Sequence, residues 1–154
     1  MKSDIEEIVI GGIYTTTEDP NTYVVITKEE NHHVVVDLYS DVHIYHRRDL
    51  NISELCPIPI TENLLKTLHF KECDGHLFGL PDEHYYELET GTVKVQMKKE
   101  DGTWCYIQPS PDAYHGCRFV SMPYLHQLQV LLAPFAPIGI ESLIQYDFKK
   151  KIKI

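Results

Sequence analysis

The chain has few of the features that would place it in a membrane, outside the cell or on nucleic acid. In its 154 residues no stretch approaches the roughly 18 consecutive apolar residues of a membrane-spanning helix. The first seven residues contain no apolar signal-peptide core, so we expect a cytoplasmic protein. Lys and Arg number 14 against 23 Asp and Glu, and nonspecific phosphate binding depends on basic side chains that replace counterions. These absences exclude a membrane protein and a generic basic nucleic-acid-binding domain.

Cysteine is scarce, and its spacing is not that of a disulfide framework or a redox motif. The four cysteines are Cys56, Cys73, Cys105 and Cys117, and no two of them form a CxxC pair. An acidic chain without an export signal is typical of a reducing compartment, where disulfides are rare. We therefore expect four free thiols, partly buried, that behave as small apolar side chains.

Motifs for catalysis are also missing. The chain contains no GxSxG, no P-loop, no GxGxxG and no HExxH. Cys117 beside His115, or Cys73 near His76, has the residue types of a thiolate–imidazolium pair, but neither has a third orienting residue or an oxyanion-hole motif. The sequence therefore predicts a protein that is not an enzyme, with no catalytic residues.

The chain contains nine histidines, which are possible metal ligands. The best local spacing is His69-x3-Cys73-x2-His76, with His84 eight residues further on. Zinc accepts such nitrogen and sulfur ligands in a tetrahedral shell. This is not a standard zinc spacing, however, and a hairpin would point some of these side chains apart. We predict no metal site and no cofactor.

What the chain does have is a formal net charge of -9 that is unevenly distributed. Residues 1–60 hold 11 acidic and 4 basic side chains, whereas residues 61–154 hold 12 acidic and 10 basic ones. The first part therefore carries -7 and the second part -2. An acidic surface promotes solubility or attracts a basic partner.

The first 56 residues are predicted to form short strands. The β-branched runs 8–10, 22–27 and 33–38 are separated by turn-type clusters. So many short strands in so few residues favour a small bent antiparallel sheet or an SH3-like barrel. We place a subdomain boundary at Pro57–Pro59, because proline restricts its neighbours to extended conformations.

Residues 57–154 are predicted to form a helix–β-hairpin–helix module. Thr61 suits the N-cap of a first helix that carries Leu64, Leu65 and Leu68. Pro123 marks a second helix with four leucines at helical spacing, which ends before Pro134. The predicted fold class is therefore α+β, with a β-rich subdomain at 1–56 and the module at 57–154.

The hairpin of this module has the clearest local signal. Val93, Val95 and Met97 alternate with polar residues, Asp101-Gly102 follows, and a second apolar run begins at Trp104. A two-residue Asp-Gly loop favours a type I′ turn, which matches the twist of paired strands. That register places Lys99 opposite Trp104 and Met97 opposite Tyr106.

Two short motifs resemble a group of small bacterial and prophage proteins. Residues 56–66, followed by His69-Phe70, resemble the motif PIPLTEExLLKxxGF, and residues 124–129 resemble the ending YVHELQNLYFALTGEEL. The chain departs from the motif at His69, where the group has glycine, and at Pro134 and Pro137, which replace LTGEEL. The resemblance implies a phage or mobile-element setting and supplies no activity and no catalytic residue.

Aromatic residues around the hairpin give the best candidate for a binding site. Tyr and Trp combine a large contact area with a polar group, which suits interfaces and base-stacking platforms alike. The alternative is that about half of these residues build the core of a small domain. The predicted ligand- or partner-binding residues are Tyr85, Tyr86, Trp104, Tyr106, Tyr114 and Arg118.

These observations favour a non-enzymatic interaction protein of phage or mobile-element type. It would bind a host protein or a small nucleotide-like ligand, for example to inhibit a host defence system. The less favoured alternative is a nucleic-acid-binding accessory protein that uses the aromatic hairpin and the basic tail at Lys149–Lys153. The sequence does not determine an oligomeric state.

Overall fold

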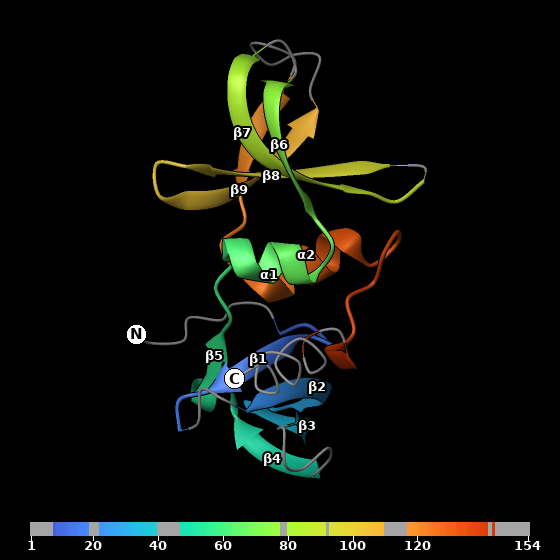
Figure 1. Cartoon of the computed structure of the whole chain (residues 1–154). Coiled ribbons are helices and arrows are strands. Elements are labelled where there is room, and N and C mark those ends of the chain that lie inside the picture. Colours follow the sequence, from blue (N-terminus) through green and yellow to red (C-terminus); the bar gives the residue numbers. More distant parts are fainter. Residues whose placement is uncertain are drawn as a thin grey trace, which may run out of the picture. The chain divides into compact units, whose positions relative to one another are not determined.

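The computed structural model describes residues 8–18, 22–39, 47–77, 80–91, 93–109, 117–141 and 143. The chain divides into two compact units (Figure 1). The first unit contains Met1–Pro59 and Tyr124–Ile154, and the second contains Ile60–Pro123. In the described ranges no helix is long and apolar enough to cross a membrane.

The first unit is built on an antiparallel sheet with the strand order β4-β3-β2-β1-β5. Successive strands pair as a meander, and β5 returns to pair with β1, where Tyr14 lies opposite Pro57 and Thr16 opposite Leu55. The strands are β1 (Ile13–Thr16), β2 (Tyr23–Glu30), β3 (His33–Tyr39), β4 (Arg47–Asn51) and β5 (Leu55–Pro57), with the 3-10 helix η1 (Ile52–Glu54) between β4 and β5.

The core of this unit follows from the alternation of apolar residues. In β2 and β3 successive side chains alternate between the two faces of the sheet, and on one face Val24, Ile26, Val34 and Val36 are buried. Tyr14, Leu50 and Leu55 from the neighbouring strands complete the same cluster. The buried set is Tyr14, Val24, Ile26, Val34, Val36, Leu50 and Leu55.

The helix α2 (Leu125–Leu132) belongs to the first unit, although it lies more than 100 residues from β1 in the sequence. The buried side chain of Gln129 accepts a hydrogen bond from the backbone nitrogen of Ile13 at 2.8 Å and donates to the carbonyl oxygen of Gly11 at 3.1 Å. The ring of His126 stacks on that of Tyr14, with 5.0 Å between the ring centroids. Gln129 thus satisfies backbone groups that burial would otherwise leave without partners.

The second unit contains α1 (Glu62–Thr67) and a five-stranded antiparallel meander with the order β10-β9-β8-β7-β6. As predicted, the hydroxyl of Thr61 caps α1 by accepting a hydrogen bond from the nitrogen of Leu64 at 3.1 Å. The strands are β6 (Lys71–Leu77), β7 (Leu80–Glu89), β8 (Lys94–Glu100), β9 (Thr103–Pro109) and β10 (Cys117–Ser121).

The β8–β9 hairpin confirms the register predicted from the sequence. Lys99 lies opposite Trp104, and Met97 lies opposite Tyr106. Asp101 and Gly102 both have positive φ, at 51° and 81°, as a type I′ turn requires. A tight turn therefore determines which residues face each other along both strands.

The predicted fold class is wrong. The described residues are mostly strand, and residues 57–154 do not form a helix–β-hairpin–helix module. The hairpin lies within a larger sheet, in which β10 pairs with β9 on one side and β7, followed by β6, lies on the other. β6 is rich in charged and small residues and so has little β-propensity of its own, but pairing with β7 supplies its hydrogen bonds.

Both predicted helices are present, with differences at their ends. His69 adopts a left-handed conformation with φ of 72° directly after α1. There the nitrogen of Phe70 donates to the carbonyl of Leu65, and the nitrogen of His69 donates to that of Lys66, which is the Schellman arrangement. Pro123 precedes the N-cap residue Tyr124 of α2 and does not occupy the first turn.

Candidate functional site

The structure places the predicted binding residues in different surroundings. Tyr85 and Tyr86 are neighbours on β7, so their side chains point to opposite faces of the sheet. Tyr85 is half-buried against Ile107 and Cys117, whereas Tyr86 is only 1% exposed. The two tyrosines therefore do not form one surface.

Trp104 is also largely buried, with 7% of its surface exposed. Its ring meets that of Tyr86 edge to face, with 5.7 Å between the centroids. Tyr106 is half-buried on β9, and Arg118 is exposed on β10. Tyr114 lies outside the described residues.

Tyr86 and Trp104 nevertheless line a pocket where the sheet forks. Pairing between β7 and β8 ends at Tyr86 and Met97, and beyond this point β7 stays paired with β6 while β8 stays paired with β9. Figure 1 shows the two hairpins running in different directions from this point. The resulting fork pocket has a volume of about 330 Å³ and is lined by Glu62, Glu83, His84, Tyr86, Lys98, Lys99 and Trp104.

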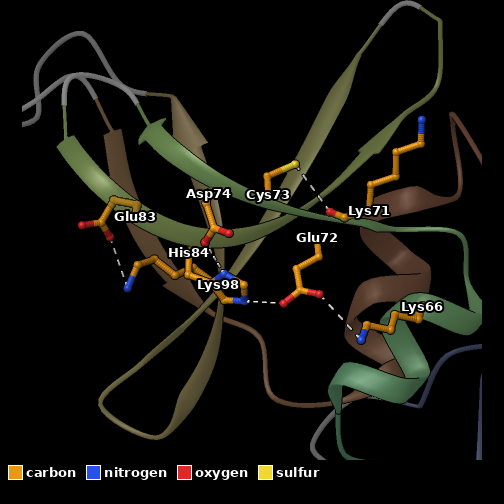
Figure 2. A network of polar contacts seen from close by, with 8 residues as sticks. All are labelled: Lys66, Lys71, Glu72, Cys73, Asp74, Glu83, His84 and Lys98. Atoms are coloured by element: carbon orange, nitrogen blue, oxygen red, sulfur yellow. Dashed lines mark hydrogen bonds and ion pairs between the residues drawn. The ribbon is translucent and has the colours of Figure 1, made fainter.

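His84 organises the polar contacts on one side of the pocket (Figure 2). Its Nδ1 lies 2.6 Å from Oδ1 of Asp74, and its Nε2 lies 3.0 Å from Oε2 of Glu72. Glu72 in turn lies 3.7 Å from Nζ of Lys66. The hydrogen bond to Asp74, with the negative charges of Asp74 and Glu72, raises the pKa of His84 even though its partial burial opposes the shift.

Lys98 is held on the other side of the pocket. Its Nζ lies 2.7 Å from Oε2 of Glu100 and 3.3 Å from Oε1 of Glu83, and only 15% of the side chain is exposed. Burial by itself lowers the pKa of Lys98, but the hydrogen bonds to Glu100 and Glu83 raise it overall. Two carboxylates thus offset the positive charge of Lys98, whereas Lys99 is exposed and has no ion pair with a described residue.

The hydroxyl of Tyr86 is the unusual group of the pocket. It is buried and forms no hydrogen bond of standard geometry with a described residue, although the carboxylates of Glu62 and Glu72 lie close enough to interact with it. Burial, and then the negative charges of Glu62 and Glu72, raise the pKa of Tyr86 to about 12. The phenol therefore stays protonated at neutral pH, and a buried polar group without a partner costs about 1–3 kcal/mol.

The thiols are free, as the sequence predicted, but they are poorly suited to act as nucleophiles. Burial is the main cause that raises the pKa values of Cys73, Cys105 and Cys117. A raised pKa keeps the sulfur protonated, whereas nucleophilic attack needs the thiolate. His115 lies outside the described residues, and so does the side chain of His76.

The candidate metal ligands do not come together. His84 has both ring nitrogens close to carboxylates, and the Sγ of Cys73 points to the carbonyl oxygen of Lys71 at 3.6 Å. Within the described ranges, no three His, Cys, Asp or Glu side chains are arranged to hold a metal ion.

A second pocket, of about 320 Å³, lies at one end of the sheet in the first unit. It is lined by Thr16, Thr17, Glu18, Thr22, Leu38, Arg48, Leu50 and Glu54. None of the buried polar atoms that lack a hydrogen-bond partner in the described part of the chain belongs to these residues. Among its described lining residues, this second pocket therefore has no buried polar atom that a ligand would have to satisfy.

Fold and site together define a mostly β protein with two five-stranded units, one of which contains a polar pocket with a buried aromatic wall. No family model, no curated protein and no solved structure matches the chain. The resemblance to prophage proteins therefore stays a prediction.

Sequence reasoning found part of this pocket. Tyr86 and Trp104 belong to the predicted site, and His84 was considered only as a metal ligand. Glu62 and Glu72 were missed, because they come from α1 and β6 and carry no local motif. The fork that gathers them follows from the pairing of whole strands.

Proposed function

We propose that this protein is a non-enzymatic binding protein and that the fork pocket in the second unit is its ligand site. The volume of about 330 Å³ lies at the lower end of the range for small-molecule pockets. Buried aromatic rings beside a few polar groups are the usual lining of such sites. The protein acts by binding, in the phage or mobile-element setting and the cytoplasmic location that the sequence predicts.

The observation that supports this proposal most is the buried hydroxyl of Tyr86. Among the described residues no hydrogen bond of standard geometry satisfies this hydroxyl, although Glu62 and Glu72 lie close to it, so a ligand that hydrogen-bonds to it would offset part of the cost of its desolvation. Residues kept at such a cost are frequent at binding sites, where stability is lost in favour of function. The raised pKa values of the thiols give separate support for a role without covalent catalysis.

A base-stacking role for the aromatic hairpin receives no support from the structure. Tyr86 and Trp104 are 1% and 7% exposed, so their rings offer little face to a nucleic-acid base. The basic tail at Lys149–Lys153 lies outside the described residues. Nucleic-acid binding is therefore the less favoured proposal.

Trp104 allows a direct test, because it is the only tryptophan in the chain and lines the pocket. Native mass spectrometry of the purified protein would detect a co-purified small molecule. Titration with chemically varied small molecules, including adenosine monophosphate, would then be followed by Trp104 emission and by melting temperature. We expect at least one compound to change both quantities in a saturable way.

The variant Tyr86→Phe separates binding from folding. It removes the buried hydroxyl and keeps the ring, so we expect equal or higher thermal stability together with weaker binding. Tyr14→Phe is the matched control, because Tyr14 is equally buried but belongs to the first unit and does not line the pocket. A protein that is unliganded on purification and responds to no compound would contradict the proposed function.

A further inference from the structure

The outer strands of the two sheets differ in how well they resist pairing with another chain. β4 and β5 are the outer strands of the first sheet, and β6 and β10 are those of the second. An outer strand presents N–H and C=O groups on its free side, so proteins protect such strands with charges, prolines, bulges or shortness. β4 consists largely of charged residues, and β5 is short and ends in Pro57. β6 contains Lys71, Glu72 and Asp74, together with a bulge after Gly75.

β10 has none of these protections. The strand Cys117–Ser121 has one charged residue, Arg118, no proline and no register shift against β9. Arg118 and Phe119 point to opposite faces of the sheet, and both side chains are exposed. The ring of Phe119 is 37% exposed although it lies opposite the buried Ile107. β10 is therefore the strand that is best suited to pair with a further strand.

The register of β10 on β9 shows which of its backbone groups face outward. The nitrogen of Met122 donates to the carbonyl oxygen of Trp104 at 2.9 Å, and the same register continues through β10 without a bulge. In an antiparallel pair, residues that bond to the partner strand alternate with residues whose N–H and C=O groups point away from it. Val120 and Arg118 therefore bond to β9, and no described strand lies on the other side of β10. The outward-facing residues are Cys117, Phe119 and Ser121.

A second β10 is complementary to this edge in one register. If Phe119 of two antiparallel copies lie opposite each other, Cys117 of each copy lies opposite Ser121 of the other, so all outward-facing backbone groups find partners. Arg118 then lies opposite Val120, and no like charges face each other. The two Phe119 rings lie on the same face, where aromatic cross-strand pairs stabilise an antiparallel sheet. The strand is thus self-complementary, as a two-fold axis requires.

We propose that β10 is an interaction edge and that its partner is β10 of a second copy of this chain, with the two-fold axis beside Phe119. The dimer joins the second units of two copies through one continuous antiparallel sheet. No residue of β10 lines the fork pocket, so this inference goes beyond the proposed function and does not depend on it.

Analytical ultracentrifugation of the full-length protein tests the dimer directly. The concentration series runs from about 1 μM to about 1 mM, because a dissociation constant of about 1 mM marks weak association. We expect a species of twice the mass of one chain that predominates at the highest concentration and dissociates on dilution. Hydrogen exchange of the Phe119 amide should slow as the concentration rises, because its N–H faces outward and gains an acceptor in the dimer.

Charges at Phe119 test the predicted register, because this residue faces its own copy. Phe119→Lys should weaken self-association at least about tenfold, and so should Phe119→Glu, since each places like charges opposite one another. An equimolar mixture of the two variants should form a dimer that neither forms alone, because opposite charges then face each other. Phe135→Lys is the matched control, since Phe135 is 44% exposed but belongs to the first unit. It should leave the association unchanged.

Ser121→Pro tests the backbone contacts separately from the side chains. It removes an N–H that faces outward, and proline is tolerated on an edge strand at such a position. We expect at least about tenfold weaker association, because one hydrogen bond is lost on each side of the two-fold axis. Ser121→Ala is the control, since it keeps the N–H at the same position. Melting temperatures at a concentration where the protein is monomeric show that the variants are folded.

Two results would overturn the inference. The first is a native protein that is still monomeric at about 1 mM. In that monomer, a protected Phe119 amide would assign the edge to a segment of the same chain, and an unprotected one would leave it to a different protein. The second is a dimer that survives both Ser121→Pro and Phe119→Lys, because it would use another surface. Failure of every compound to bind at the fork pocket would contradict the proposed function alone.

Discussion

The two sheets have the same strand count and the same antiparallel pairing, yet they differ in what they bury. Each contains a fully buried tyrosine, Tyr14 in the first unit and Tyr86 in the second. In both, burial is the main cause that raises the pKa of the phenol to about 12. Tyr14 lies in an apolar cluster with its ring stacked on His126. Tyr86 lies among carboxylates at the wall of a pocket.

The extent of strand pairing explains the difference. In the first sheet β2 and β3 stay paired from Tyr23 and Tyr39 to Glu30 and His33, with a bulge after Ile26, and Val24, Ile26, Val34 and Val36 form a buried apolar face. In the second sheet the pairing of β7 with β8 stops at Tyr86, and charged residues occupy the opening. The first sheet therefore buries an apolar core, whereas the forked second sheet forms a pocket with charged walls.

The largest expected effect on stability comes from the buried apolar cluster of the first sheet. Ile26→Ala removes a side chain that is 1% exposed, and we expect a loss of about 2–5 kcal/mol in the free energy of unfolding. Ile10→Ala is the control, because Ile10 is 60% exposed. Urea denaturation measures both variants. Equal losses of unfolding free energy in the two variants would show that burial of Ile26 in the apolar cluster does not stabilise the first sheet.

The next effect tests how α2 is attached to the first sheet. Gln129→Ala leaves the backbone nitrogen of Ile13 without its buried acceptor, so we expect a loss of about 1–3 kcal/mol. Gln108→Ala, at an exposed position of β9, should change the stability by less than about 0.5 kcal/mol. If the two variants unfold at the same urea concentration, the Gln129 contacts do not hold the helix.

The hairpin turns of the two sheets allow a third comparison. Asn31 and His32 join β2 and β3 with φ values of 37° and 68°, whereas Asp101 and Gly102 join β8 and β9. Glycine adopts positive φ without steric cost, so His32→Gly should stabilise the protein by about 0.5–1 kcal/mol. Gly102→Ala should destabilise it by a similar or larger amount. Thermal or urea denaturation checks both signs, and two changes of the same sign would contradict the comparison.

The smallest expected effect concerns the charged side of the second sheet. The hydrogen bond to Asp74, with nearby negative charge, raises the pKa of His84 above its ordinary value of 6.5. Protonated His84 therefore stabilises the folded state. This stabilisation is complete below about pH 6.5 and is lost as the pH rises through the pKa of His84 in the folded protein. The melting temperature should accordingly fall as the pH rises, and the variant His84→Gln should show a smaller fall.

His33→Gln in β3 is the control for that measurement, because His33 is exposed in the first unit and no ion pair joins it to a described carboxylate. Since His84 is itself about half exposed, solvent and salt screen its ion pairs, and added salt should reduce the effect. A melting temperature of the native protein that rises between about pH 6 and 8, when that of His84→Gln does not, would contradict the prediction.

Local signals predicted part of this structure correctly. The Asp101-Gly102 turn gave the register of β8 and β9, and Thr61 marked the start of α1. The sequence predicted a strand only at 76–78, at the end of β6, because the charged residues before it have little preference for a strand and become one only beside β7. The candidate site was also incomplete, with Tyr86 and Trp104 predicted, whereas Glu62 and Glu72 were missed because they lie on other elements, far from the hairpin in the sequence.

The sequence by itself determined the turns, the apolar alternation of β2 and β3, the helix cap and the free thiols, because each depends on a few neighbouring residues. Only the tertiary structure decided that α2 packs with the first sheet and that β7 and β8 part at Tyr86. These features depend on contacts between residues far apart in the chain. No local propensity encodes such contacts, and the pocket exists because of them.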